Sequence, residues 1–251
     1  MIQEQEWFKD WFNSPYYHLL YKNRDEVEAI AFIQRLIQHL KPLQNSKLLD
    51  IACGKGRHSK ALADMGFDVT GIDISSDSIA AAKQFESDNL HFEQHDMRLN
   101  YKHNYFDVAF NFFTSFGYFK TQEEHQEAIK TMTTALKEEG LLVIDYLNVH
   151  FEETHFEKLV EKKIENYLFI STKWHTDTHF FKQVQVADNE HALPRHLSTE
   201  RVAKFNLGDF NEMLSLQDMQ IQEVFGDYQL GHYDIHESPR MIIVAKKRAF
   251  K

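Results

Sequence analysis

The stretch LLDIACGKGRHS, residues 48–59, joins a short apolar run to a helix-like segment through two glycines. A glycine-rich turn between a strand and a helix lets bare backbone approach a ligand closely, and it often holds part of a nucleotide. The spacing is G-x-G-x-x-S, with Ser59 at the third position. An acid, Asp73, lies 19 residues after Gly54 (73 − 54), as it would in a dinucleotide-binding fold. The turn alone therefore leaves the nucleotide open.

Asp50, just ahead of the glycines, favours one of the two ligands. A carboxylate next to a pyrophosphate would be repelled by several kcal/mol in a poorly hydrated cleft. S-adenosylmethionine carries no phosphate, and it has an ammonium group and a sulfonium cation instead. The residues around the turn therefore favour S-adenosylmethionine over a dinucleotide.

The surrounding sequence predicts alternating strands and helices. Apolar runs predict strands at 47–53, 67–74, 90–95, 105–113 and 141–147, and periodic patterns predict helices at 24–40, 57–66, 75–85 and 122–140. Alternation at this spacing indicates a parallel sheet with helices on both faces. We therefore expect an α/β fold of the Rossmann-like, doubly wound type.

The polarity pattern and the residue composition of the sequence change after about residue 151. Segments 158–187 and 195–207 alternate in polarity and are rich in β-branched and aromatic residues, which indicates antiparallel strands. A short helix at 208–217 then leads to two final strands at 219–228 and 240–247. The expected sheet is seven-stranded and mostly parallel, with an antiparallel β insert after its fifth strand.

Four segments follow from this assignment. We expect an N-terminal helical segment at 1–44, a nucleotide-binding core at 45–150, the antiparallel insert at 151–206, and the last helix and two strands at 207–251.

Composition narrows the class of protein. The formal net charge of −10 disfavours a broad nucleic-acid-binding surface. A single cysteine, Cys53, excludes an intrachain disulfide and fits a reducing compartment, so we expect a cytoplasmic protein. No run of about 18 apolar residues predicts a membrane span, and the polar N-terminus does not resemble a signal peptide.

Several segments together resemble a known family. LLDIACGKG resembles motif I of the class I S-adenosylmethionine-dependent methyltransferases. VTGIDIS (69–75), EQHDMR (93–98), FDVAFNFFTSFGYF (106–119) and EGLLVIDYL (139–147) look like the motifs that follow it, in order. Within the family, GKGRHS is similar to the small-molecule and tellurite-resistance-like branch. The resemblance implies methyl transfer from S-adenosylmethionine to a small-molecule acceptor.

The resemblance also implies a cofactor site. Asp73 would accept both ribose hydroxyls, Ile74 would press on the adenine, and Asp96 would accept from its amino group beside the Met97 backbone. Asn111 would face the methionine end. The remaining motif I positions implied at the site are Asp50, Cys53, Gly54 and Gly56. Helix capping by Asp73, a turn at Asp96 and plain core packing by Ile74, Asn111 and Cys53 are the structural alternatives.

Aromatic residues crowd the N-terminus, from Trp7 to Tyr21. They could simply fill the core. Alternatively, SPYYHLLYKNRDE (14–26) loosely resembles a cofactor-covering segment, in which Tyr17 would face the sulfonium by cation–π attraction and Arg24 would pair with the methionine carboxylate.

Other features stay open at this stage. No catalytic base is identified, and His58, Tyr118, Tyr146 and His150 are candidates by expected position alone. HTDTH (175–179) and HYDIH (232–236) could each place His, Asp and His on one strand face as metal ligands, but a hairpin turn explains the first equally well, and we expect no metal.

Alternatives for the function also stay open. An RNA or protein methyltransferase and a non-catalytic S-adenosylmethionine-binding protein both remain. The insert could roof a small-acceptor pocket or pair with a second copy in a homodimer.

Overall fold

The computed structural model describes residues 6–21, 26–155, 157–188 and 196–249. Its main sheet has seven strands in the order β10-β11-β5-β4-β1-β2-β3. Parallel pairing joins β3, β2, β1, β4 and β5, while β11 runs antiparallel to β5 and β10 antiparallel to β11. The bounds are β1 Lys47–Ile51, β2 Asp68–Asp73, β3 Leu90–Gln94, β4 Phe106–Asn111, β5 Leu136–Leu147, β10 Met219–Phe225 and β11 Arg240–Lys247. The Rossmann-like, mostly parallel sheet is confirmed.

Helices cover both faces of this sheet. Apolar side chains of α6 and α8 pack with one face, and those of α3, α4 and α5 pack with the other. The bounds are α3 Glu26–Leu40, α4 Arg57–Asp64, α5 Ser76–Ala82, the 3₁₀ turn η1 Lys83–Phe85, α6 Gln122–Ala135 and α8 Leu207–Ser215. The central strands are buried on both sides, which explains their continuous apolar sequence.

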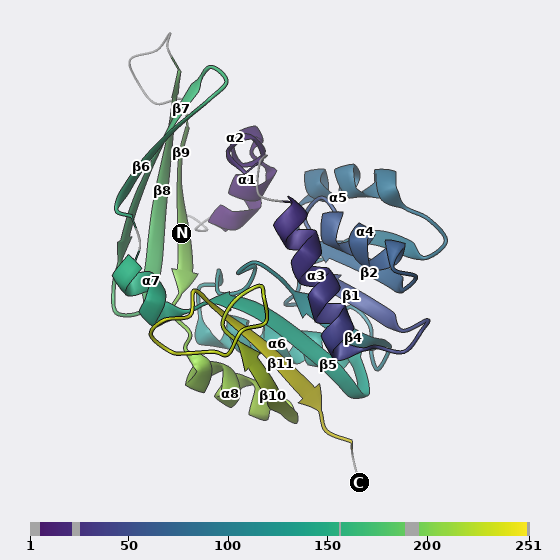
Figure 1. Cartoon of the computed structure of the whole chain (residues 1–251). Helices are drawn as coiled ribbons and strands as arrows, with labels where there is room; N and C mark the ends of the chain where they lie inside the picture. The colour runs from purple at the N-terminus through teal and green to yellow at the C-terminus, as the bar shows by residue number, and fades with distance from the viewer. Residues whose placement is uncertain (1–5, 22–25, 156, 189–195, 250–251) are drawn as a thin grey trace.

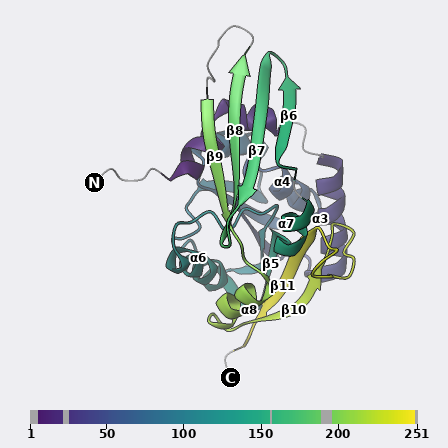
Figure 2. The same cartoon turned by 90° about the vertical axis from the view of Figure 1, so that its left-hand side faces the viewer.

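The insert after β5 is a separate four-stranded antiparallel sheet in the order β6-β7-β8-β9. It stands away from the edge of the main sheet at which the parallel strands end (Figure 1), with its strands side by side in Figure 2. A short helix, α7, leads into it. The bounds are α7 Val149–His155, β6 Leu159–Ile164, β7 Tyr167–His175, β8 His179–Asp188 and β9 His196–Ala203. The predicted antiparallel insert is thus confirmed.

Two short N-terminal helices lie against one face of the insert. They are α1 Trp7–Asn13 and α2 Pro15–Leu20, and Ser14 caps α2 by accepting a hydrogen bond from the Tyr16 backbone at 3.2 Å. Trp11 and Leu20 are buried against an apolar patch of the insert formed by Phe169, Val184 and Val186. Figures 1 and 2 show these helices between the insert and the main sheet.

Three local predictions were wrong. The helix expected at 122–140 ends at Ala135, because buried Leu136 turns to an extended backbone and pairs with Phe106 as β5 begins. Residues 149–155 form α7, where no helix was expected. Residues 232–236 lie in a loop and not on a strand face, because Asp234 and Ser238 close a turn there: the Asp234 backbone donates to Ser238 Oγ at 2.8 Å.

No helix in the described part of the chain combines the length and the apolar composition needed to cross a membrane.

Candidate active site

The glycine turn follows β1 and leads into α4. Ala52, Gly54 and Gly56 all have positive φ, at 61°, 56° and 78°. A Cβ placed on Gly54 would meet nothing within 4 Å, and Gly54 lines a cavity. A Cβ on Gly56 would instead lie 2.5 Å from Phe92 Cζ on β3. The two glycines therefore serve different purposes: Gly54 leaves space for a ligand, and Gly56 lets the turn pack on the core.

Alanine substitution should separate these two purposes. Gly54→Ala is expected to lower the free energy of unfolding by about 1 to 2 kcal/mol, because alanine is strained at positive φ. Gly56→Ala should cost about 2 kcal/mol more, because its new methyl group also overlaps the Phe92 ring. Urea unfolding followed by tryptophan fluorescence measures both values. Equal losses in the two variants would contradict this packing role of Gly56.

Asp73 ends β2 beside the turn. Its Oδ2 accepts from the Gly54 backbone at 2.8 Å, and its Oδ1 accepts from the Ser75 backbone at 2.8 Å. Burial raises the pKa of this carboxyl, although the two backbone hydrogen bonds oppose the rise. Each carboxylate oxygen has a further lone pair. Asp73 is thus held rigidly and can still accept two more hydrogen bonds from a ligand.

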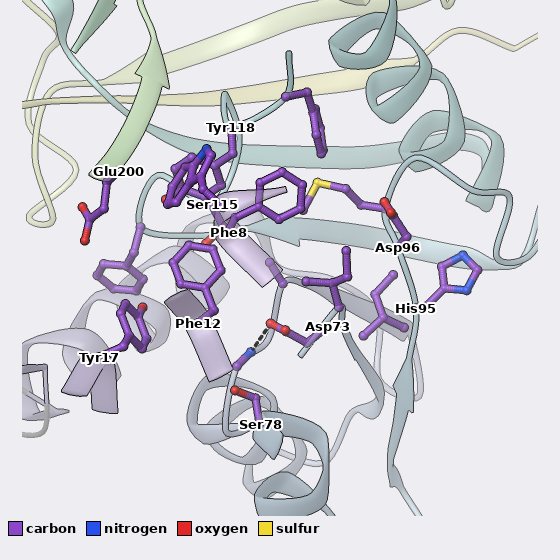
Figure 3. A pocket seen from close by; sticks show the side chains of 18 of the residues that line it. Phe8, Phe12, Tyr17, Asp73, Ser78, His95, Asp96, Ser115, Tyr118 and Glu200 are labelled. Carbon is purple, nitrogen blue, oxygen red and sulfur yellow. Dashed lines mark hydrogen bonds between the residues drawn. The ribbon is translucent and has the colours of Figure 1, made fainter. Parts of the chain in front are cut away.

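A cavity opens beside Asp73, at the carboxyl ends of β1, β2 and β3 (Figure 3). The N-terminal helices form its opposite wall. The polar side chains of the cavity wall lie near the ends of the core strands, and the wall formed by the N-terminal helices is aromatic. Its lining residues are Trp7, Phe8, Phe12, Tyr17, Tyr21, Ala52, Gly54, Ile72, Asp73, Ile74, Ser78, His95, Asp96, Met97, Phe113, Ser115, Tyr118, Phe119 and Glu200.

Asp96, in the loop after β3, is fixed by an arginine. Arg98 Nη2 lies 2.6 Å from Asp96 Oδ2, and Arg98 Nη1 lies 2.5 Å from Glu6 Oε1 and 2.8 Å from Glu124 Oε1. Burial would raise the pKa of Asp96, but the Arg98 hydrogen bonds and charge outweigh it and hold the pKa below its usual value. Arg98 therefore ties the Asp96 loop to α6 and to Glu6, just before α1. Arg98 was not predicted from the sequence as a site residue, although it stands two positions after Asp96.

Besides Gly56, three predicted site residues lie in or next to the turn and outside the cavity lining. Asp50 is 1% exposed and accepts a hydrogen bond from Ser59 Oγ at 2.6 Å. Asn111 donates through Nδ2 to the Ile51 carbonyl at 3.1 Å, and Cys53 is buried against the position of Gly71. Their direct contact with a cofactor stays a prediction, and their observed contacts support the turn.

The four candidate bases differ in their position relative to the cavity. Only Tyr118 lines the cavity. Tyr146 is fully buried and donates to the Ala203 carbonyl at 2.6 Å, and His58 stacks on Phe113 with ring centroids 4.8 Å apart. His150 lies on α7, with its ring 5.8 Å from that of His236. Arg24, predicted to pair with the methionine carboxylate, falls outside the described residues.

A second cavity of about 380 Å³ lies under the insert and adjoins the first. The two share Tyr21, Phe113, Tyr118 and Glu200. The remaining lining residues are Thr114, Leu147, Glu152, Lys173, Trp174, Phe180, Phe181, Lys182, Val202 and Arg240. The charged residues of the insert were not predicted from the sequence as part of a site. Across the described ranges, no group of three His, Cys, Asp or Glu side chains is placed to hold a metal ion.

Known proteins similar to this chain indicate the same kind of site as its geometry does. Residues 42–200 match a family model described as a methyltransferase domain. The Bacillus subtilis protein named "Putative methyltransferase YqeM" is 28% identical over 195 residues, covering 74% of this chain and 78% of that protein. A dTDP-3-amino-3,4,6-trideoxy-alpha-D-glucopyranose N,N-dimethyltransferase of Streptomyces venezuelae is 31% identical over 133 residues, covering 51% of this chain and 54% of that protein.

Solved structures share the fold. An S-adenosylmethionine-dependent methyltransferase of Clostridium acetobutylicum superposes with a TM-score of 0.77 at 15% identity, covering 93% of this chain and 96% of that chain. The sugar N-methyltransferase KedS8 of Streptoalloteichus gives a TM-score of 0.73 at 21% identity, covering 93% of each chain. The family match extends over most of the nucleotide-binding core and the insert. The chain therefore belongs to the class I methyltransferase-domain family, as its glycine turn and the motifs that follow implied.

Proposed function

We propose that the chain transfers a methyl group from S-adenosylmethionine to a small-molecule acceptor. The observation that carries this proposal is a pair of adjoining cavities that share four lining residues. One cavity lies at Asp73 and the glycine turn, and the other lies under the insert. Relatives named for the methylation of amino sugars, glycine and sarcosine support a small acceptor.

The first cavity has the side chains that this cofactor needs. Asp73 would accept the ribose hydroxyls through its remaining lone pairs, and Asp96 would accept from the adenine amino group. Ile74 and Met97 supply apolar surface for the adenine ring. Aromatic rings on α1 and α2, Tyr17 among them, would face the methionine end, where π-faces favour a sulfonium cation.

The chain's own contribution to the reaction is positioning and the exclusion of water. The bound cofactor supplies a methyl carbon on a positively charged sulfur, which needs little further activation. Holding an acceptor atom in line with that carbon, in a cavity closed by aromatic side chains, accounts for a large share of such catalysis. Tyr118 lines both cavities and is the residue we propose to contact the reacting groups.

The four segments expected from the sequence acquire proposed roles on this basis. Segment 1–44 would cover the cofactor, 45–150 would bind it, 151–206 would roof the acceptor, and 207–251 would complete the sheet. RNA or protein methylation, cofactor binding without catalysis, homodimer formation and cytoplasmic location stay as predictions or alternatives of the sequence analysis.

Asp73→Ala tests the cofactor site. We expect it to weaken the binding of S-adenosylhomocysteine by about 2 kcal/mol, because hydrogen bonds to a charged group are lost from a buried position. Isothermal titration calorimetry measures this change. Asp68→Ala, at the opposite end of the same strand and paired with Lys47 at 2.7 Å, is the matched control and should leave the affinity unchanged.

Two results would reject the proposal in different ways. Unchanged affinity in Asp73→Ala would remove the cofactor assignment. Tight S-adenosylhomocysteine binding without methyl transfer to amines, phenols, carboxylates or RNA would instead favour a binding protein.

A further inference from the structure

Three charged residues form a row across the inner face of the insert. In the register of β7, β8 and β9, Lys173 pairs with Lys182, and Lys182 pairs with Glu200. Directly paired residues of an antiparallel sheet point to the same face. All three line the second cavity. Like charges placed directly opposite each other destabilise a sheet. Lys182 is held in this position by a hydrogen bond from its Nζ to Tyr21 Oη.

The two lysines together favour an anion. Lys173 Nζ lies 3.5 Å from Glu152 Oε1, and Lys182 Nζ lies 3.9 Å from Glu200 Oε1. Arg240 lines the same cavity and is held by Asp145 at 2.6 Å. An acidic group of a ligand could contact both ammonium groups at once, beside the ring of Phe180, which lies two residues from Lys182 on the same face of the insert.

Glu200 occupies the junction of the two cavities. Its Oε1 accepts from Trp11 Nε1 at 2.8 Å and from Tyr21 Oη at 3.2 Å, and no hydrogen bond to Oε2 is found among the described residues. The side chain is 18% exposed. In Figure 3, Glu200 lies at the end of the first cavity away from Asp96. One carboxylate oxygen is thus fixed by the N-terminal helices while the other is left for a ligand.

We infer that the acceptor is a small amine that also carries a carboxylate or phosphonate-like acidic group. Its nitrogen would lie at Glu200, toward the cofactor, and its acidic group would lie at Lys173 and Lys182. This inference rests on the proposed function. Neighbouring strands are about 5 Å apart, so the nitrogen and the acidic group are separated by a few bonds, as in a short amino acid.

The charge of Glu200 suits a nitrogen nucleophile. The neutral amine donates an N–H to Glu200 Oε2, and its lone pair attacks the methyl carbon. A C–N bond forms, the C–S bond breaks, and its electron pair stays on sulfur, which becomes neutral. Positive charge therefore develops on nitrogen next to the carboxylate, which stabilises it. A phenolate or carboxylate nucleophile would instead be repelled by Glu200.

Matched probes test both ends of the site. β-Alanine, n-propylamine and 3-hydroxypropanoate share a three-carbon chain and carry the amine and acid, the amine alone, or a hydroxyl and acid. Glycine and 4-aminobutyrate bracket the length. We expect labelled methyl transfer from S-adenosylmethionine to at least one amino acid, about tenfold or more above the simple amine, and none to the hydroxy acid.

Variants assign the two ends. Glu200→Gln keeps an acceptor for Trp11 and Tyr21 but removes the charge, and should lower kcat by about 100-fold. Lys182→Met should raise KM for the amino acid about tenfold with a smaller change in kcat. Glu161→Gln and Lys163→Met, exposed on the outer face of β6, are the matched controls and should leave both constants unchanged.

The outcomes separate this inference from the proposed function. If the native chain does not bind S-adenosylhomocysteine, the proposed function itself is rejected. Three results would overturn only the acceptor assignment, provided that the cofactor still binds tightly. They are no transfer to any of the amino acids, equal transfer to 3-hydroxypropanoate, and a Glu200→Gln variant that keeps most of the native kcat. Melting temperatures of all variants exclude misfolding as the cause.

Discussion

Trp11→Ala should release the N-terminal helices from the insert. Trp11 is 1% exposed, packs with Leu20, Phe169 and Val184, stacks on His196 at 5.5 Å, and donates to Glu200. Replacing a buried tryptophan by alanine costs about 3 to 5 kcal/mol. Helices of 7 and 6 residues are too short to persist without packing, so the loss should fall on their docking rather than on the whole fold.

Hydrogen exchange measures this release. In the variant, amides of residues 6–21 should exchange much faster, while those of the main sheet keep their protection. Affinity for S-adenosylhomocysteine should fall as well, because Phe8, Phe12 and Tyr17 leave the cavity wall. Trp174→Ala, at a tryptophan that is 39% exposed on the same insert, is the control for exchange. Unchanged exchange over 6–21, or equal acceleration everywhere, would show that these helices are not an independently docked cover.

The parallel core was predictable because its signal is local. Each central strand is buried on both faces and reads as an apolar run, and the glycine turn and the acid after β2 lie at fixed distances from it. The end of α6 was not predictable in this way. Leu136 continues the helical pattern, and only its pairing with Phe106, distant in sequence, makes it part of β5.

The acceptor side of the site depends on pairing that no local pattern specifies. Lys173, Lys182 and Glu200 come together only through the register of three strands. The turn at 176–178 sets the register of β7 and β8, with a hydrogen bond from the Thr176 backbone to the His179 carbonyl. The hairpin turn considered for the HTDTH stretch is present between His175 and His179. Asp50 served to choose between two ligands in the sequence analysis, but its hydrogen bond with Ser59, in the first turn of α4, could not be foreseen from its sequence position.

Asp50 should make the stability of the protein fall as pH rises from about 4 to about 6. Burial, with a smaller contribution from the charge of Asp73, raises its pKa from 3.8 to about 6 in the folded chain, although Ser59 opposes the rise. Between these values the folded state holds a proton that the unfolded state has lost, so unfolding becomes easier as pH increases. The contribution is fully lost above the folded pKa. A shift from 3.8 to about 6 corresponds to about 3 kcal/mol.

Asp50→Asn isolates this contribution. Asparagine can still accept from Ser59 Oγ but carries no charge, so the variant lacks the pH-dependent loss. The unfolding free energy of the variant minus that of the native chain should therefore rise by about 2 to 2.5 kcal/mol between pH 4 and pH 7. Urea unfolding of both chains at each pH gives this difference, in which the titration of all other groups largely cancels.

A flat difference would mean that Ser59 and the nearby Arg57 stabilise the ionised carboxylate as well as water does. A rise of the expected size would mean that the chain keeps a costly buried charge directly beneath the glycine turn. Such a cost is reduced by a cation bound above the turn, because an opposite charge nearby lowers the pKa of a carboxyl. The affinity for the sulfonium cofactor should then increase from pH 5 to pH 7 more than the affinity for its neutral-sulfur product, and Asp50→Asn should abolish that difference.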